Sequence, residues 1–463
     1  MSNSWREHPN SLRSFLAGMP VEAQTASLPL STIASDYARR FAGPPAYGRT
    51  LAEPAVRYEA DGCPLPVVIG CYGDEPRVRQ KLPNLPDKFT AAGVQQLLTH
   101  VLPARHIAND ELPPSGSNLQ CLSDLPILTH TPRDAGAYIT QGFLYAEMGD
   151  ITAFSAHRLW LLGERQLAVS ILSGRQLAVA HQQSLARGKA LPLSINIGIP
   201  PAAAIAASLS GKTLPPSVSK LSLAGALAGS PVRLADCNSV EARYLADSEI
   251  VLEGTLGPDR ADERAVADYS MPEFVGYSGK AGNNLVVFNL ESMRVRQNAF
   301  YPALIGPGRE QSVQLGLAGA LNALLALPKT LTRGVADLRY SHAGGGMLLL
   351  YVALLPGCNS DEHLQSLSKA LIEVNPFTKM VIFVDRDINL QADEDVLWAL
   401  VTRCRLEQDT HFLAHFRALQ MDPSQSGKRW RDGLAGAAQR IWINATIPAG
   451  LQDSFRRSYN ELV

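Results

Sequence analysis

The chain has 463 residues, of which 46% are hydrophobic and 18% are charged, a balance typical of a soluble globular protein. One hydrophobic core rarely supports so long a chain, so we expect two or three domains. The formal net charge is −1, from 42 basic and 43 acidic residues. This balance supplies no positive field for nucleic acid or an anionic membrane, and we expect neither as a partner.

The cysteines and the apolar runs indicate the compartment. The six cysteines are scattered and form no Cys-x-x-Cys pair, as is typical of a reduced intracellular protein. Residues 1–20 lack the apolar segment of a signal peptide, and the longest apolar run, 347–356, is too short to span a bilayer. We therefore expect a cytoplasmic protein.

The first part of the chain alternates helix and strand patterns. Ser11 can cap a short helix, residues 65–70 have the apolar, β-branched pattern of a strand, and helical spacing returns over 91–102. A polar linker rich in Pro and Ser follows. These patterns predict an N-terminal α/β segment over residues 1–117.

Short β-rich segments dominate residues 118–328. They cover residues 138–145, 159–162, 167–172, 193–197, 232–235, 248–256 and 284–290. Two helices rich in small residues are expected at 202–209 and 221–227. Many short strands with few helices predict a barrel-like sheet domain.

The last part alternates again, which predicts a small α/β domain over residues 329–448. The expected elements are a strand at 347–355, a helix at 361–373, a strand at 380–385 and a helix at 393–403. The pattern of residues 449–463 predicts a polar C-terminal helix, which we expect to reach a neighbouring subunit. His411 and His415 have the spacing of one helix face, but the Glu of a His-Glu-x-x-His motif is missing, so we interpret them as a surface or packed pair.

Two acids stand out in the loop that follows the strand at 248–256. Asp268 and Glu273 lie five residues apart among Tyr269, Met271 and Phe274. An apolar wall and a neighbouring like charge both raise a carboxyl pKa, which is how carboxylates are prepared for acid/base chemistry. The alternative is a pair of ordinary loop acids that face water.

Several short sequence motifs, taken together and in order, resemble those of the UbiD family of decarboxylases, which includes the ferulic acid decarboxylases. The resemblance runs from about residue 11 to residue 446. The motifs are DAGAYIT (134–140), GIPPAA (198–203), SEIVLEG (248–254), VDRDI (384–388), DVLWALVTR (395–403) and INAT (443–446).

The resemblance implies a fold and a cofactor. The fold is a multidomain α/β and α+β chain with a central split β-barrel, similar to flavin reductases, between an N-terminal α/β segment and a C-terminal α/β oligomerisation domain. The cofactor is prenylated FMN. Loss of CO₂ from an sp² carbon leaves an electron pair that no side chain can accept, so a cofactor has to accept it.

The family's catalytic trio, an arginine and two acids, falls on Arg158, Asp268 and Glu273. The resemblance implies that Arg158 orients a carboxylate through a charge-assisted fork and that Glu273 protonates the carbon that loses CO₂. Asp268 would hold the arginine. It is one methylene shorter than the family's Glu, and the glycines of the family's motif are missing around it.

The family's divalent-metal ligands are substituted. The Asn position is Ala153, the His position is Gly174 or Gln176, and the Glu position is Lys220. A hard cation is not held by these side chains, so we expect no metal.

Two interpretations of Lys220 follow. In one, it supplies positive charge to a cofactor phosphate together with Arg175 and Lys428. In the other, the cofactor is lost and Lys220 pairs with an acid such as Asp236 or Glu241. The cofactor contacts that the resemblance implies are Ser155, Ala156, Arg175, Gln176, Ser208, Leu209, Lys220 and Lys428.

The sequence therefore predicts reversible, non-oxidative decarboxylation of an α,β-unsaturated or (hetero)aromatic acid with prenylated FMN, supplied by a prenyl-FMN synthase. One alternative is a non-catalytic partner or structural subunit that has lost the flavin, and another is a flavin-independent decarboxylase. A homodimer or homohexamer is the expected assembly.

Overall fold

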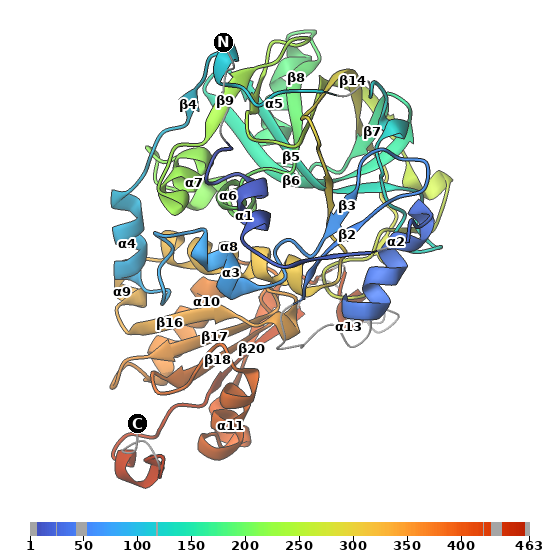
Figure 1. The fold of residues 1–463 in the computed structure, drawn as a ribbon. Coiled ribbons are helices and arrows are strands. Elements are labelled where there is room, and N and C mark those ends of the chain that lie inside the picture. Colours follow the sequence, from blue (N-terminus) through green and yellow to red (C-terminus); the bar gives the residue numbers. More distant parts are fainter. Residues whose placement is uncertain are drawn as a thin grey trace. The chain divides into compact units, whose positions relative to one another are not determined.

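The structure, a computed structural model shown in Figure 1, describes residues 7–24, 26–42, 53–116, 119–419, 421–426 and 438–458. The chain divides into two compact units. The first comprises Met1–Tyr47, Leu51–Leu85 and Leu98–Gln314, and the second comprises Gly48–Thr50, Pro86–Leu97 and Leu315–Val463. The expected domain boundaries at residues 117 and 328 stay predictions.

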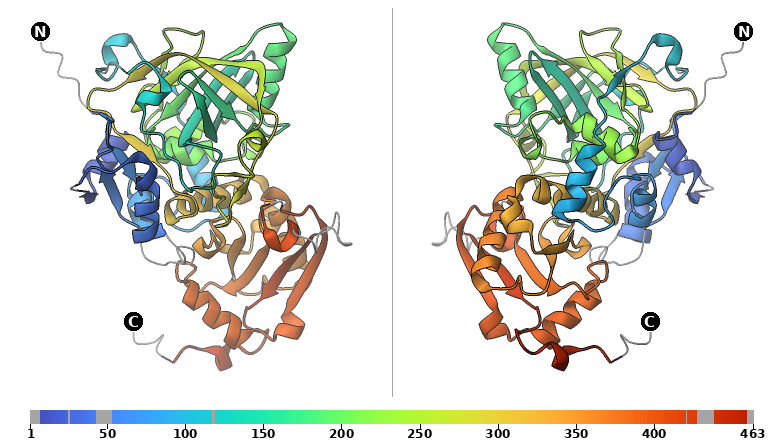
Figure 2. Two further views of the ribbon diagram at one scale, coloured as in Figure 1. Left: turned by 90° about the vertical axis from the view of Figure 1, so that its right-hand side faces the viewer. Right: turned by 90° about the vertical axis from the view of Figure 1, so that its left-hand side faces the viewer.

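A closed barrel forms the centre of the first unit, and its strands are seen in teal, green and yellow in Figure 2. Its strand order in the described part of the chain is β11-β14-β7-β6-β5-β8, and neighbouring strands are antiparallel. The bounds are β5 (Tyr138–Met148), β6 (Ile151–Gly163), β7 (Gln166–Val169), β8 (Leu191–Ile197), β11 (Ile250–Ala261) and β14 (Leu285–Val295). The prediction of a barrel with flanking α/β segments is confirmed.

The barrel closes because alternate residues along its strands are apolar and share one core. Leu144, Leu193, Ile195, Leu252 and Phe288 are all fully buried in that core. A single large cluster that joins strands of several hairpins fixes their register, since a slip of one residue would expose each of these side chains.

Three helices accompany the barrel strands in the chain: α5 (Gln176–Ala186), α6 (Pro201–Ala207) and α7 (Lys220–Ala228). Helix α6 begins at a proline, whose missing N–H costs nothing in the first turn. Helix α7 is capped by Ser219, whose hydroxyl accepts the Ser222 N–H at 3.0 Å, and it ends at Gly229 with φ of 69°. These caps place the first residue of α7, Lys220, at a defined helix start.

The rest of the first unit, in its described part, consists of three small sheets and short helices. The sheets are β1-β2-β3-β15, β10-β9-β4 and the two-stranded β12-β13. The strand bounds are β1 (Val21–Ala23), β2 (Ala55–Tyr58), β3 (Val67–Ile69), β4 (Arg105–His106), β9 (Arg233–Asp236), β10 (Arg243–Leu245), β12 (Tyr269–Ser270), β13 (Gly279–Lys280) and β15 (Tyr301–Ala303). The helices are α1 (Leu12–Ala17), α2 (Leu30–Tyr37) and α3 (Glu75–Gln80). Ser11 caps α1 as predicted, accepting the Ser14 N–H at 3.1 Å.

The second unit contains a sheet of order β16-β17-β18-β20-β19, in which β17, β18 and β20 are parallel. The strands are β16 (Val335–Tyr340), β17 (Leu349–Leu354), β18 (Met380–Asp385), β19 (Thr410–Phe416) and β20 (Ala438–Asn444). The helices that lie wholly or mostly in this unit are α4 (Ala91–Thr99), α8 (Arg309–Ala326), α9 (Lys329–Thr332), α10 (Asp361–Val374), α11 (Asp393–Arg403), α12 (Leu406–Asp409) and α13 (Pro423–Ser426). No helix in the described ranges is both long and apolar enough to cross a membrane.

The interpretation of His411 and His415 as a surface or packed pair agrees with the structure, in which the ring of His411 stacks on Trp442 with centroids 3.9 Å apart and His415 is exposed. Their expected placement on a helix was wrong, because both lie on strand β19. The expected C-terminal helix was also wrong. In the described part of the predicted C-terminal helix there is only a 3₁₀ turn, Gln452–Phe455. Gly450 adopts φ of 80°, outside the α-helical range, so a helix cannot begin at residue 449.

Candidate active site

The first half of β6 carries the centre of the predicted site. Strand β7 pairs with β6 only from Leu159 to Gly163, so residues 151–158 have no strand partner on that side within the described structure. On the other side, β5 has a bulge in which two of its residues face Arg158. A bulge redirects nearby side chains and is common beside active sites. The local geometry therefore frees one edge of β6 for other groups.

Arg158 and Glu273 meet at this strand although they are far apart in sequence. Arg158 Nη1 donates to Glu273 Oε1 at 3.1 Å, and the side chains are 25% and 24% exposed. Because both side chains are partly accessible, Arg158 can exchange Glu273 for the carboxylate of a dissolved molecule, and Glu273 is then not left as a buried unpaired charge. The structure thus brings together the two residues to which the sequence assigned carboxylate binding and proton delivery.

The loop that carries Glu273 is fixed at its base by a buried acid. Glu263 accepts the Tyr138 hydroxyl at 2.8 Å and the Gly282 N–H at 2.7 Å. The short hairpin β12 (Tyr269–Ser270) and β13 (Gly279–Lys280) continues the loop. Glu263 was not predicted from the sequence, and its position just after the end of a strand was the available signal.

Asp268 lies on the same loop but faces solvent. Its described contact is through the main chain, where its carbonyl accepts the Ala281 N–H at 3.2 Å. The ion pair of Arg158 is made with Glu273. The role of Asp268 in holding the arginine therefore stays a prediction.

Lys220 crosses from the start of α7 to the free edge of β6. Its Nζ donates to the carbonyl of Phe154 at 2.8 Å and to the carbonyl of Ala207, the last residue of α6, at 2.9 Å. Burial, and to a smaller extent the nearby Arg175 guanidinium, lowers the Lys220 pKa to about 7. Since both described acceptors are main-chain carbonyls, the alternative in which Lys220 pairs with Asp236 or Glu241 is wrong.

A cavity of about 250 Å³ opens beside Lys220. The cavity is lined by Gln176, the first residue of helix α5, and by Ser219, Lys220 and Leu221 at the start of helix α7. Unpaired N–H groups at a helix start carry partial positive charge and bind anions. One acid, Asp150, also lines the cavity. Two helix starts and one ammonium group make it suited to a phosphate.

The other predicted cofactor contacts are distributed around these two centres. Ser155 and Ala156 follow Phe154 on β6, and Ser208 and Leu209 follow Ala207. Ser155 is partly exposed and Ala156 is exposed, whereas Leu209 is buried. Gln176 lines the cavity beside Lys220, and Lys428 lies outside the described residues.

The three substituted metal-ligand positions are chemically poor in ligands. Ala153 is buried in the barrel core, and Gly174 is an exposed residue with φ of 74°. Nowhere in the described ranges do three His, Cys, Asp or Glu side chains cluster as a metal site would require. The expectation of a metal-free site stays a prediction.

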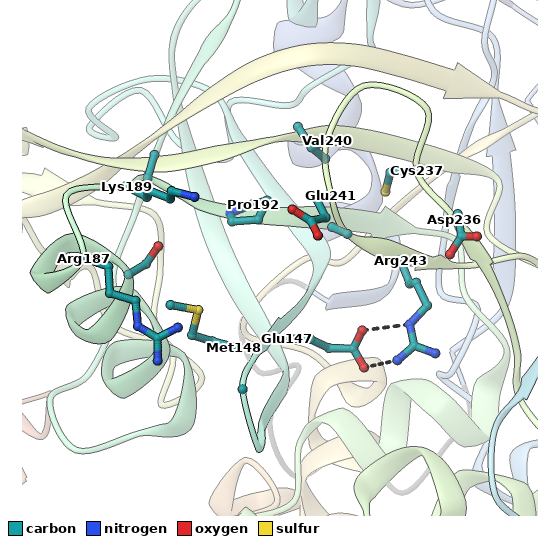
Figure 3. Close-up of a pocket in the computed structure, with 14 residues that line it drawn as sticks. Glu147, Met148, Arg187, Lys189, Pro192, Asp236, Cys237, Val240, Glu241 and Arg243 are labelled. Carbon is teal, nitrogen blue, oxygen red and sulfur yellow. Dashed lines mark hydrogen bonds and ion pairs between the residues drawn. The ribbon is translucent and has the colours of Figure 1, made fainter.

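A larger cavity of about 810 Å³ lies at another part of the first unit (Figure 3). Its wall combines three basic residues, Arg187, Lys189 and Arg243, with acids, and Arg243 forms a bidentate pair with Glu147. The predicted catalytic and cofactor residues do not line it. Because its charges are mixed, it shows no preference for an anion.

Comparison with known proteins identifies the family. The model of the UbiD 3-octaprenyl-4-hydroxybenzoate carboxy-lyase Rift-related domain matches residues 112–310, and that of the C-terminal domain matches residues 315–445. Gallate decarboxylase of Lactiplantibacillus plantarum is 30% identical over 340 residues, which cover 71% of this chain and 69% of that protein.

Solved structures agree with these matches. The apo 3,4-dihydroxybenzoic acid decarboxylase of Enterobacter cloacae superposes with a TM-score of 0.85 at 26% identity, over 97% of this chain and 96% of that one. HmfF of Pelotomaculum thermopropionicum, a UbiD-class enzyme solved in complex with FMN, has the same fold, with a TM-score of 0.81 at 24% identity over 98% of each chain. The chain belongs to the UbiD family of carboxy-lyases.

Proposed function

We propose that the chain catalyses reversible, non-oxidative decarboxylation of an α,β-unsaturated or (hetero)aromatic carboxylic acid with prenylated FMN, and that side chains neutralise the flavin phosphate in place of a divalent metal. The observation that carries this proposal is the placement of two centres on one strand. Phe154, whose carbonyl holds Lys220, and Arg158, which pairs with Glu273, are four residues apart on β6.

The spacing suits a flavin mononucleotide. Four residues of extended strand span about 13 Å. A molecule with an anionic end and a ring end can therefore place its phosphate beside Lys220 and the two helix starts while its ring lies towards Arg158. The phosphate cavity of about 250 Å³ and its ammonium group are the features that fit the cofactor.

When bound, the prenylated flavin supplies the electron sink that decarboxylation at an sp² carbon requires. Arg158 binds the substrate carboxylate through its planar fork. That contact takes Arg158 away from Glu273, and a carboxylate that loses its cation beside a second carboxylate takes up a proton more readily. Glu273 then delivers this proton to the carbon that has lost CO₂.

The test is to produce the protein together with a prenyl-FMN synthase. The proposal expects flavin absorbance, an intact mass of a non-covalent complex that includes prenylated FMN, and CO₂ release from members of a panel of aromatic and acrylic acids. Protein made without the synthase is the control. Colourless protein that releases no CO₂ under these conditions would contradict the proposal.

A further inference from the structure

The side chain of Ser155 contacts a histidine two residues along the same strand. The Oγ of Ser155 lies 2.8 Å from Nε2 of His157, and Nδ1 of His157 lies 3.1 Å from the carbonyl oxygen of Ser170. Both side chains are partly exposed on β6. Ser155 directly follows Phe154, whose carbonyl holds Lys220, and it lies three residues before Arg158.

The direction of these hydrogen bonds follows from the carbonyl. A carbonyl oxygen can only accept, so Nδ1 of His157 has to carry a proton. Burial, with a smaller contribution from the Lys220 ammonium, lowers the His157 pKa to about 4, so the ring is neutral near pH 7. A neutral imidazole protonated at Nδ1 has a lone pair at Nε2. Ser155 therefore donates its single hydroxyl proton to His157.

We propose that His157 is a positioning residue that commits the Ser155 hydroxyl to donation, so that Ser155 offers only acceptor lone pairs and binds an N–H or O–H group of the flavin instead of its phosphate. This inference rests on the proposed function. A phosphate dianion has only hydrogen-bond acceptors. The Ser155 hydroxyl, once it has donated its proton to His157, also has only acceptor lone pairs left, so the two cannot form a hydrogen bond. The ring N–H and the ribityl hydroxyls of a flavin are the matching donors.

The first test measures the tautomer in flavin-free protein. Long-range ¹H–¹⁵N spectra of histidine-labelled protein at pH 7.5, with the His157 signal assigned by its loss in His157→Gln, are expected to show the neutral Nδ1–H form. An Nε2–H tautomer or an imidazolium ring would overturn the inference. This readout requires neither cofactor nor activity.

The second test compares FMN with riboflavin, which lacks the phosphate, by fluorescence titration. Ser155→Ala is expected to weaken both flavins by the same factor, about two- to tenfold, which is the effect of one hydrogen bond. His157→Phe should weaken both as well, whereas His157→Gln keeps an acceptor within reach of Ser155 and should restore binding. Lys220→Met is the contrasting variant and should weaken FMN alone.

Each outcome decides the inference. A loss of affinity for FMN but not for riboflavin in Ser155→Ala would mean that Ser155 touches the phosphate, and unchanged affinity for both would mean that it touches no part of the flavin. Either result overturns the inference while leaving the proposed function intact. Wild-type protein that binds neither flavin would overturn the proposed function and the flavin contact together, and the tautomer would still be decided separately.

Discussion

Replacing Lys220 by methionine should make the stability of the flavin-free protein, relative to that of the wild type, fall as the pH rises from 7 to 9. Burial lowers the Lys220 pKa from the ordinary 10.5 to about 7. At about 1.4 kcal/mol per pKa unit, this pKa difference lowers the free energy of unfolding by at most about 5 kcal/mol. Between these two values the unfolded chain binds more protons than the folded one, so this contribution to stability rises with pH.

The sign of the pH dependence distinguishes the titration of Lys220 from a simple change in packing, which would not depend on pH. The cost of holding the ammonium group is fully present below pH 7 and disappears as the pH passes 10.5. Lys220→Met removes this cost and removes the two bonds to Phe154 and Ala207 at every pH. The stability of the variant relative to that of the wild type should therefore fall by about 2 kcal/mol from pH 7 to pH 9.

Urea unfolding at pH 7, 8 and 9, without flavin, measures this difference. Lys189→Met is the matched control, because Lys189 is exposed and lines the other cavity. Its effect on stability should not change over this pH range. Saturating FMN should make the free energy of unfolding of the wild type depend less on pH, since the phosphate favours the charged form of Lys220. A difference for Lys220→Met that is the same at pH 7 and pH 9 would refute the reasoning.

Three further predictions concern the acid/base centre and its support. Glu273→Gln should lower the rate of CO₂ release by the flavin-loaded enzyme by at least about 100-fold. Asp262→Asn, a change at an exposed acid of the same loop, is the control and should leave that rate unchanged. Near-normal turnover in Glu273→Gln would reject the proton-delivery role. Arg158→Lys should lower kcat/KM about ten- to hundredfold because the planar fork is lost, and steady-state kinetics that match the wild type would exclude a bidentate contact. Tyr138→Phe removes a donor to the buried Glu263 and should lower the free energy of unfolding by about 1–3 kcal/mol, which urea unfolding would show; an unchanged midpoint would mean that the bond contributes nothing.

The strand pattern made much of the fold predictable. Runs of β-branched and apolar residues such as 248–256 become strands of the barrel because their side chains alternate into one core. The histidine pair on β19 was expected on a helix because a four-residue spacing puts side chains on one face of a helix and also on one face of a regular strand. Only the pairing of β19 with β20 distinguishes the two.

The candidate site was predictable where side chains carry it. Arg158 and Glu273 could be named from the family's motifs, and they form an ion pair in the structure. The partners of Lys220 could not be predicted, because main-chain carbonyls are present at every residue and leave no mark in a sequence. The contact of Ser155 with His157 could not be predicted for a related reason, since the direction of its hydrogen bond depends on the carbonyl of Ser170, the residue after β7.

Whether Lys220 replaces a metal ion at the phosphate is tested most directly by titrating FMN into the protein in excess EDTA and again with added Mn²⁺, with Lys220→Met beside the wild type. We expect equal affinity of the wild type in both conditions. We expect at least about tenfold weaker FMN binding by Lys220→Met, the effect of losing a charge-assisted contact. Binding that EDTA abolishes and Mn²⁺ restores would contradict this role of Lys220.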